Sequence, residues 1–322
     1  MKKKFVSLIH LGNNMWQKPG NTRLHAREEI DSLYWDHLAT DEEVFKEVTA
    51  FMAQHGVNTV LIDMGEGVQL KSHPELAVDG SWSREKFREH LKRLRDLGLT
   101  PLPKFNFSCG HNAWMKDMGY KVGLPEYTQF CRDIVNETCE LYDGPELFHL
   151  GLEEEDELSQ KINGHPVRIS RSAPKKAEDC ADLFETCRKN GARPWMWTDP
   201  NTVKEFGGDE KFQEYIPKDV VMSNWFYGSI HNGMPDLWDD PNVLLYKKLD
   251  EWGYDQIPTG STWSLPANNL RTMAFARQYL TDERLLGFMT ASWIQTFPSQ
   301  KYGIMHDTCC FELARKKYYP DA

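Results

Sequence analysis

Short apolar runs alternate with amphipathic segments along the whole chain, a pattern typical of repeating strand–helix units. The apolar runs have the length of buried strands, and the amphipathic segments repeat apolar residues at helical spacing. Strands are predicted at Phe5–Leu11, Thr59–Met64, Pro101–Phe107, Leu147–Glu153, Arg193–Asp199, Val220–Tyr227, Asp255–Trp263 and Leu285–Trp293. Helices are predicted at Asp41–His55, Ser83–Leu97, Pro125–Tyr142, Ala173–Lys189, Asp209–Tyr215, Pro241–Trp252, Asn268–Leu280 and Phe311–Tyr319.

This alternation predicts parallel strands joined by right-handed crossovers. Eight strand–helix units in 322 residues fit an α/β fold with a single (β/α)8 TIM barrel, so residues 1–322 are expected to form one domain. The alternative is an open, doubly wound sheet, which normally has a glycine-rich phosphate turn after an early strand. The first strand here runs into HLGNNMW instead, so the pattern favours the barrel.

Composition and charge narrow the function classes. Lys and Arg number 38 against 48 Asp and Glu, and the net charge of −10 disfavours a nucleic-acid surface. No apolar run approaches the ~20 residues of a membrane-spanning helix, so no membrane partner is expected. The 7 cysteines lack CxxC pairs and framework spacing, which argues against both a zinc site and a disulfide scaffold.

The first residues of the chain bear on the cellular location of the protein. The start MKKKFVSLIHLGNN resembles a signal peptide over a few residues, but its apolar stretch is short and no A-x-A-like site follows. We therefore interpret it as the first strand. A cytoplasmic location is expected for the sequence as written, and a periplasmic or secreted location stays open if a leader preceded it. A homodimer also stays open.

Tryptophans mark four successive predicted strand ends. They are Trp197, Trp225, Trp263 and Trp293, and a barrel enzyme carries its active site at this end of the strands. Indole faces stack on the C–H faces of sugars and form apolar pocket walls. For any one tryptophan, the alternative to sugar stacking is that its ring simply fills space in the core. Four in succession beside carboxylates favour a sugar pocket.

An acidic run, GLEEEDE, follows the fourth predicted strand and provides the strongest polar signal. A solvated loop is the alternative interpretation. Two adjacent carboxylates in an apolar cleft do not ionise together easily, so one holds a proton near neutral pH. A protonated carboxylic acid is what a glycosidase donates to the leaving-group oxygen. Other polar candidates at the strand ends are His10, Asp63, Asn106, His111, Asp199 and Tyr227.

Several motifs, in order along the chain, are similar to those of family 20 glycoside hydrolases, the β-N-acetylhexosaminidases. Residues 73–111 resemble the family's P-E-L turn, helix and strand ending in a histidine, here His111. FHLGLEEE (148–155) resembles the family's H-x-G-G-D-E motif. WMWTD (195–199), NWFYG (224–228) and LLGFMTASW (285–293) resemble the family's strand-five, strand-six and final-strand motifs.

The resemblance implies a barrel in which the 2-acetamido oxygen of the sugar attacks its own anomeric carbon. It implies that Glu154 is the general acid/base, that Glu153 stands for the Asp that orients the acetamido group, and that Tyr227 bonds this group. It also implies a tryptophan wall of Trp197, Trp225 and Trp293, with His111 and Asp199 in or behind the pocket. A carbohydrate is the implied partner. Neither a metal nor an organic cofactor is implied.

The chain departs from the family pattern at several positions. Glu153 replaces an Asp, Leu152 replaces a Gly, and residues 104–106 read Lys-Phe-Asn where the family has Glu-Ile-Asp. The sugar-binding Arg after the first strand is absent, and His10, Asn13 and Asn14 stand there instead. These departures leave open a two-carboxylate mechanism that uses Asp63, Glu66 or Asp199.

Two other functions stay open. One is a metal-dependent barrel enzyme such as a sugar isomerase, which would need three or more of a set of candidate ligands to converge on one ion: Asp63, Glu66, His111, His149, Glu153 and Asp199. The other is a carbohydrate-binding protein without activity. His149 has a simpler interpretation as a hydrogen-bonded histidine beneath the site.

Overall fold

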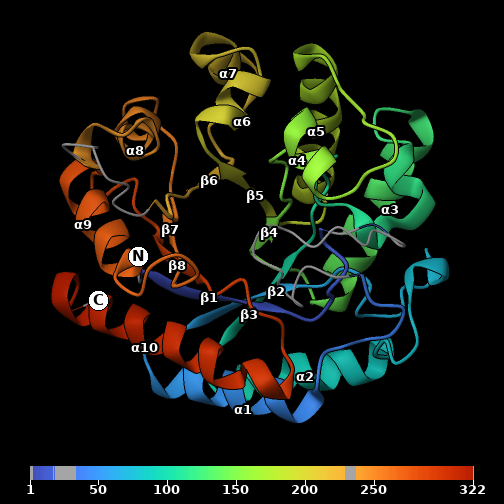
Figure 1. The fold of residues 1–322 in the computed structure, drawn as a ribbon, viewed down its shortest axis with the longest axis horizontal. Helices are drawn as coiled ribbons and strands as arrows, with labels where there is room; N and C mark the ends of the chain where they lie inside the picture. The colour runs from blue at the N-terminus through green and yellow to red at the C-terminus, as the bar shows by residue number, and fades with distance from the viewer. Residues whose placement is uncertain (1–2, 17, 19–33, 229–236, 322) are drawn as a thin grey trace.

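The computed structural model describes residues 3–16, 18, 34–228 and 237–321. Within them, eight parallel strands form one sheet in the order β6-β5-β4-β3-β2-β1-β8-β7 (Figure 1). The strands are β1 Lys4–His10, β2 Thr59–Asp63, β3 Thr100–Lys104, β4 Leu147–His149, β5 Arg193–Thr198, β6 Val221–Asn224, β7 Thr259–Gly260 and β8 Gly287–Ala291. Isolated bridges link each outer strand to a residue that flanks the other, Met222 of β6 to Gln256 and Thr259 of β7 to Trp225. The sheet is therefore a nearly closed (β/α)8 TIM barrel, as predicted.

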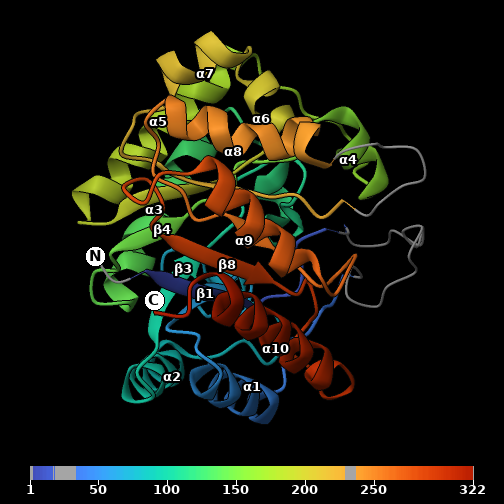
Figure 2. The same ribbon diagram turned by 90° about the vertical axis from the view of Figure 1, so that its left-hand side faces the viewer.

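Helices surround the sheet in both views (Figures 1 and 2). They are α1 Glu42–Gln54, α2 Arg84–Asp96, α3 Pro125–Leu141, α4 Glu157–Ile162, α5 Ala173–Lys189, α6 Pro200–Glu205, α7 Asp209–Tyr215, α8 Pro241–Glu251, α9 Asn268–Tyr279 and α10 Lys301–Tyr318. Short 3₁₀ helices span Pro74–Leu76, Ala113–Tyr120, Leu237–Asp239 and Pro298–Gln300. None of the described helices has the length and apolar character required to span a membrane.

Side-chain caps explain several helix starts. Asp41 accepts a hydrogen bond from the Val44 N–H at the start of α1, and Ser83 accepts one from the Lys86 N–H at the start of α2. Each cap satisfies a backbone donor that has no partner inside the helix. Both starts agree with the sequence prediction.

Alternation along the strands decides which side chains face the barrel interior. In β1, Val6 and Leu8 belong to the interior cluster, whereas Phe5 and Ile9 pack in the layer between sheet and helices. The next inward position is His10. By the same alternation, Asp63, Lys104 and His149 follow the inward Leu61, Leu102 and Leu147 in β2, β3 and β4. The barrel interior therefore changes from apolar to polar at the carboxyl ends of these strands.

Several predicted boundaries were wrong. Helix α10 begins at Lys301 rather than Phe311, because Ile304, Thr308 and Phe311 already form one buried face. Strand β4 ends at His149 rather than Glu153, since the backbone turns away there. Strand β3 ends at Lys104 rather than Phe107, and β7 is limited to Thr259–Gly260. Helices α4 and α6 were not predicted.

Candidate active site

The loop after β4 has an unusual backbone conformation. Gly151, Leu152 and Glu154 all have positive φ, at 74°, 71° and 52°. A non-glycine residue in this region costs about 1–2 kcal/mol, so the surrounding structure must impose it. Leu152 takes up here a conformation that suits glycine, which is the residue of the family motif at this position. This turn brings the next two carboxylates toward the same histidine.

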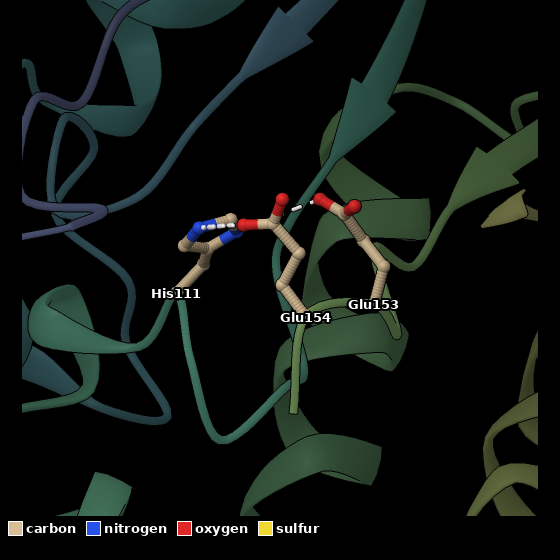
Figure 3. A group of neighbouring side chains, drawn as sticks. All are labelled: His111, Glu153 and Glu154. Carbon is tan, nitrogen blue, oxygen red and sulfur yellow. Dashed lines mark ion pairs between the residues drawn. The ribbon is translucent and has the colours of Figure 1, made fainter. Parts of the chain in front are cut away.

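Both carboxylates pair with one histidine, and Glu154 lies between His111 and Glu153 in Figure 3. His111 Nε2 is 2.9 Å from Glu154 Oε2, and His111 Nδ1 is 3.5 Å from Glu153 Oε1. Glu153 is buried, with 5% of its surface exposed, whereas Glu154 is half-buried. The three side chains therefore form one group in which Glu154 is the more accessible carboxylate.

The protonation of this group follows from its burial. Burial, and then the charge of Glu154, raise the pKa of Glu153, while His111 opposes this shift. Burial alone would lower the pKa of His111, but Glu154 and Glu153 outweigh it and hold that pKa above its usual range. At neutral pH His111 is positively charged and stabilises the carboxylates. A carboxylate pair so close together retains a proton more readily than an isolated one.

The third glutamate of the acidic run points into a buried ion network. Arg171 pairs with Glu155 and, at 2.9 Å, with Asp179 Oδ2. Lys176 Nζ lies 2.5 Å from Glu205 Oε2, and Glu205 Oε1 accepts a hydrogen bond from the Glu155 N–H. This network fixes the loop at Glu155. The resemblance gave roles to Glu153 and Glu154 but none to Glu155, and the ion network of Glu155 was not predicted.

Aromatic rings border the group of three. The Trp293 ring lies 5.7 Å from Trp197 and 6.4 Å from Tyr227, centroid to centroid. Tyr227 also stacks on Trp225 at 5.1 Å. Trp16 lies 6.2 Å from Trp293 and 6.2 Å from His111. We call Trp16, Trp197, Trp225, Tyr227 and Trp293 the aromatic wall.

Two tryptophans differ from expectation in their placement. Trp263 joins the edge of the aromatic wall, 6.3 Å from Tyr227, and is 40% exposed. Trp16 was not predicted as a site residue, and its only signal was its position a few residues after the first strand. Trp293 has φ 56°, another strained backbone position at the site.

Polar residues at the ends of β1–β4 lie inside the barrel mouth. Lys104 Nζ is 2.8 Å from Asp63 Oδ2, and His10 Nδ1 is 3.3 Å from the same oxygen. Burial would raise the pKa of Asp63, but the charge of Lys104 and the hydrogen bond with His10 outweigh it and lower that pKa to about 2. Asn106 Nδ2 contacts Met15 Sδ at 2.6 Å. We call His10, Asp63, Lys104, Asn106 and His149 the polar floor.

Three other candidates have structural partners. Asp199 Oδ1 caps α6 by accepting hydrogen bonds from the Thr202 N–H and hydroxyl, at 2.7 and 2.6 Å. His149 Nδ1 accepts a hydrogen bond from the Gly151 N–H, and its ring packs against Trp197 at 4.5 Å. Glu66 accepts hydrogen bonds from the backbone N–H groups of the loop after β1. These partners match the simpler interpretation of His149.

The metal-dependent alternative can be compared with this geometry. Among the described residues, the group that could hold an ion is His111, Glu153 and Glu154, with ligand atoms within 4.8 Å of one another. Only two of the six ligands proposed from the sequence belong to it. Both ring nitrogens of His111 face carboxylates, so a metal ion would have to displace a proton from a histidine whose pKa is raised. The donor set therefore fits a metal poorly.

Comparison with known proteins shows where this fold recurs. No protein-family model matches the chain, and no curated protein matches it in sequence. Solved glycosidase structures do match. The fold that they share with this chain is the (β/α)8 barrel. The GH20 exo-β-N-acetylglucosaminidase of Vibrio harveyi, solved with N-acetylglucosamine, has a TM-score of 0.61 at 13% identity, over 99% of this chain and 57% of that chain.

Two further structures show the breadth of the similarity. The tandem GH20 modules of the pneumococcal exo-β-D-N-acetylglucosaminidase StrH give a TM-score of 0.65 at 14% identity, over 98% of this chain and 84% of that chain. A GH138 enzyme targeting pectin rhamnogalacturonan II gives 0.58 at 13% identity, over 99% of this chain and 39% of that chain. The resemblance to family 20 barrels is thus confirmed at the level of the fold.

Proposed function

We propose that the protein is a glycoside hydrolase that removes terminal 2-acetamido sugars by a retaining, substrate-assisted mechanism. The observation that carries this proposal is the His111–Glu153–Glu154 group beside the aromatic wall at the carboxyl ends of the strands. Such a pairing of an acid–base group with ring-stacking surfaces suits a sugar. The similarity in fold to structures named as N-acetylglucosaminidases supports the substrate class.

The proposed role of Glu154 follows from the solvent exposure of its side chain. Glu154 is half-buried, so a leaving-group oxygen and an incoming water can both reach it, and we assign it as the general acid/base. It gives its proton to the leaving oxygen while the acetamido oxygen bonds to the anomeric carbon, forming a cyclic oxazolinium intermediate. It then takes a proton from the water that opens this intermediate. His111 bonds to Glu154 and orients it.

Glu153 is assigned to the acetamido group. It is more deeply buried than Glu154. In the reactive form the proton that this pair retains is on Glu154, so Glu153 is the carboxylate that orients the acetamido N–H and balances the positive charge that develops in the ring. Burial also raises the pKa of Tyr227 well above its usual value, which keeps the phenol protonated as a donor to the acetamido oxygen. Trp197, Trp225 and Trp293 supply the stacking surfaces.

The test is hydrolysis of aryl glycosides, including N-acetylglucosaminide and N-acetylgalactosaminide, with leaving groups of graded pKa. Glu154→Gln should lose about 10²–10⁴-fold in kcat/KM on poor leaving groups and much less on activated ones, because an acid matters most when the leaving group is poor. Glu153→Gln should lose activity across the series. Glu157→Gln, an exposed member of the same acidic run, is the matched control.

Other outcomes would contradict the proposal in different ways. Cleavage of only non-acetamido sugars would exclude assistance by the acetamido group. Turnover abolished by a chelator and restored by a divalent cation would favour the metal-dependent alternative. Sugar binding without turnover on any substrate would favour the binding protein.

A further inference from the structure

Met15 lies over two buried hydrogen-bond donors of the polar floor. Its Sδ is 2.6 Å from Asn106 Nδ2 and 3.8 Å from Lys104 Nζ. A thioether sulfur is a weak acceptor, whereas buried amide and ammonium groups normally donate to oxygen. Lys104 is 0% exposed and Asn106 is 2% exposed. Both donors thus face a position that an oxygen atom would satisfy better than sulfur does.

Two histidines of the polar floor add further unsatisfied nitrogens. His149 Nδ1 accepts from the Gly151 N–H, so the neutral ring carries its hydrogen on Nε2. Burial and the charge of Lys104 hold the pKa of His149 well below its usual range, so the ring is neutral. Among the described residues, Nε2 of His149 and Nε2 of His10 have no hydrogen-bond partner, although both are buried.

These groups lie side by side and next to the aromatic wall. The strand register pairs His10 with Asp63, Asp63 with Lys104, and Lys104 with His149. The His10 ring is 5.8 Å from Trp16 and 5.9 Å from Trp293. Trp16 in turn contacts His111. A sugar bound against these tryptophans would therefore have the polar floor at one edge and the carboxylates at another.

We propose that the polar floor is a subsite for the hydroxyl groups at the non-reducing end of an uncharged sugar, and that a sugar oxygen replaces the Met15 sulfur on binding. The proposal rests on the proposed function. Met15 suits this part because its side chain is unbranched and adaptable. Asn106 Nδ2 and the two histidine Nε2 atoms then gain the oxygen partner that each lacks, and Lys104 gains a second one beside Asp63.

The charges around the subsite favour a neutral sugar. Asp63 already neutralises the Lys104 ammonium at 2.8 Å. Glu153 and Glu154 lie nearby, beyond Trp16 and His111. A carboxylate or sulfate on the sugar would find no free cation among these groups and would be repelled by the two glutamates. Uncharged hydroxyls encounter no such repulsion.

The experiment measures calorimetric binding to Glu154→Gln protein, in which turnover is slowed. The ligands are N-acetylglucosamine, its 3-, 4- and 6-deoxy derivatives, and its 6-sulfate. At least one deoxy derivative should bind about tenfold or more weakly than the parent sugar, and adding Asn106→Leu should remove most of that difference. The 6-sulfate should bind more weakly than the parent. Adding Met15→Ala should keep or raise the affinity.

A matched control substitution separates local from general effects. Asn136→Leu changes an exposed asparagine on α3 and should leave binding unchanged. Thermal unfolding of each variant checks that it folds. If the affinity is the same for the parent sugar and every deoxy derivative, and Asn106→Leu does not change it, the subsite proposal alone is overturned. Tighter binding of the 6-sulfate than of the parent sugar would also overturn the subsite proposal alone. No binding of any of these sugars would instead overturn the proposed function.

Discussion

Gly110→Ala tests whether the position of Glu154 sets the activity. A Cβ at residue 110 would lie 2.0 Å from the carbonyl oxygen of Glu154, whereas non-bonded heavy atoms are ordinarily about 3.5 Å apart. The backbone of the loop must therefore move by more than about 1 Å. A displacement of this size in a reacting group costs about 10²-fold in rate, or about 2.7 kcal/mol.

The assay compares kcat/KM on an aryl N-acetylglucosaminide with the thermal unfolding midpoint. Gly303→Ala is the control, because the close contact of its Cβ, at 2.7 Å, is with the terminal Cδ1 of Ile294, which can move aside. We expect Gly110→Ala to lose about 10²-fold in kcat/KM while Gly303→Ala stays within a few-fold. Full activity of folded Gly110→Ala protein would refute the reasoning that the strained loop positions the catalytic carboxylate.

Four further predictions concern stability and binding. Lys176→Met should lower the free energy of unfolding, measured in urea, by about 3–5 kcal/mol, because it leaves buried carboxylates without a compensating charge. Lys175→Met on the surface should lower it by less than about 1 kcal/mol, and equal losses for the two variants would contradict the buried ion network. His111→Gln should lower the free energy of unfolding most below pH 6.5 and progressively less toward pH 10, because the ion pairs of His111, whose pKa is raised, stabilise the fold only while the ring is charged. A loss of stability that does not depend on pH would be inconsistent with these ion pairs. Asp199→Ala should cost about 1 kcal/mol through the lost cap of α6, measured in urea, and no loss would mean that the cap is dispensable. Trp293→Ala should raise KM for an aryl N-acetylglucosaminide by up to about tenfold, and an unchanged KM would exclude stacking on this ring.

Much of the fold follows from the hydrophobic pattern. Runs such as TVLID and FVSLI predict buried strands because they are too apolar and too short for other elements, and capped helix starts such as Ser83 are visible in the sequence. The start of α10 was missed because Gly303 and the adjacent Cys309 and Cys310 obscure a helical face. That face becomes apparent only when α10 packs on α1 and α9.

The site was only partly predictable for a physical reason. The acidic run and the strand-end tryptophans are visible in the sequence, but the positive φ values of Leu152 and Glu154 are not. Those values decide that Glu153 and Glu154 meet His111, while Glu155 turns into the ion network. The contact between Met15 and the ends of β3 likewise depends on a loop conformation that no periodicity encodes.

The most direct test of the central claim is to weaken the acetamido oxygen as a nucleophile. Aryl N-acetylglucosaminides with zero, one, two or three fluorines on the acetyl methyl group would be compared by kcat/KM. Substrate-assisted hydrolysis predicts a steep fall with each added fluorine, because the oxygen that attacks the anomeric carbon becomes less nucleophilic. A rate that does not change along the series would contradict the account and point to an enzyme carboxylate as the nucleophile.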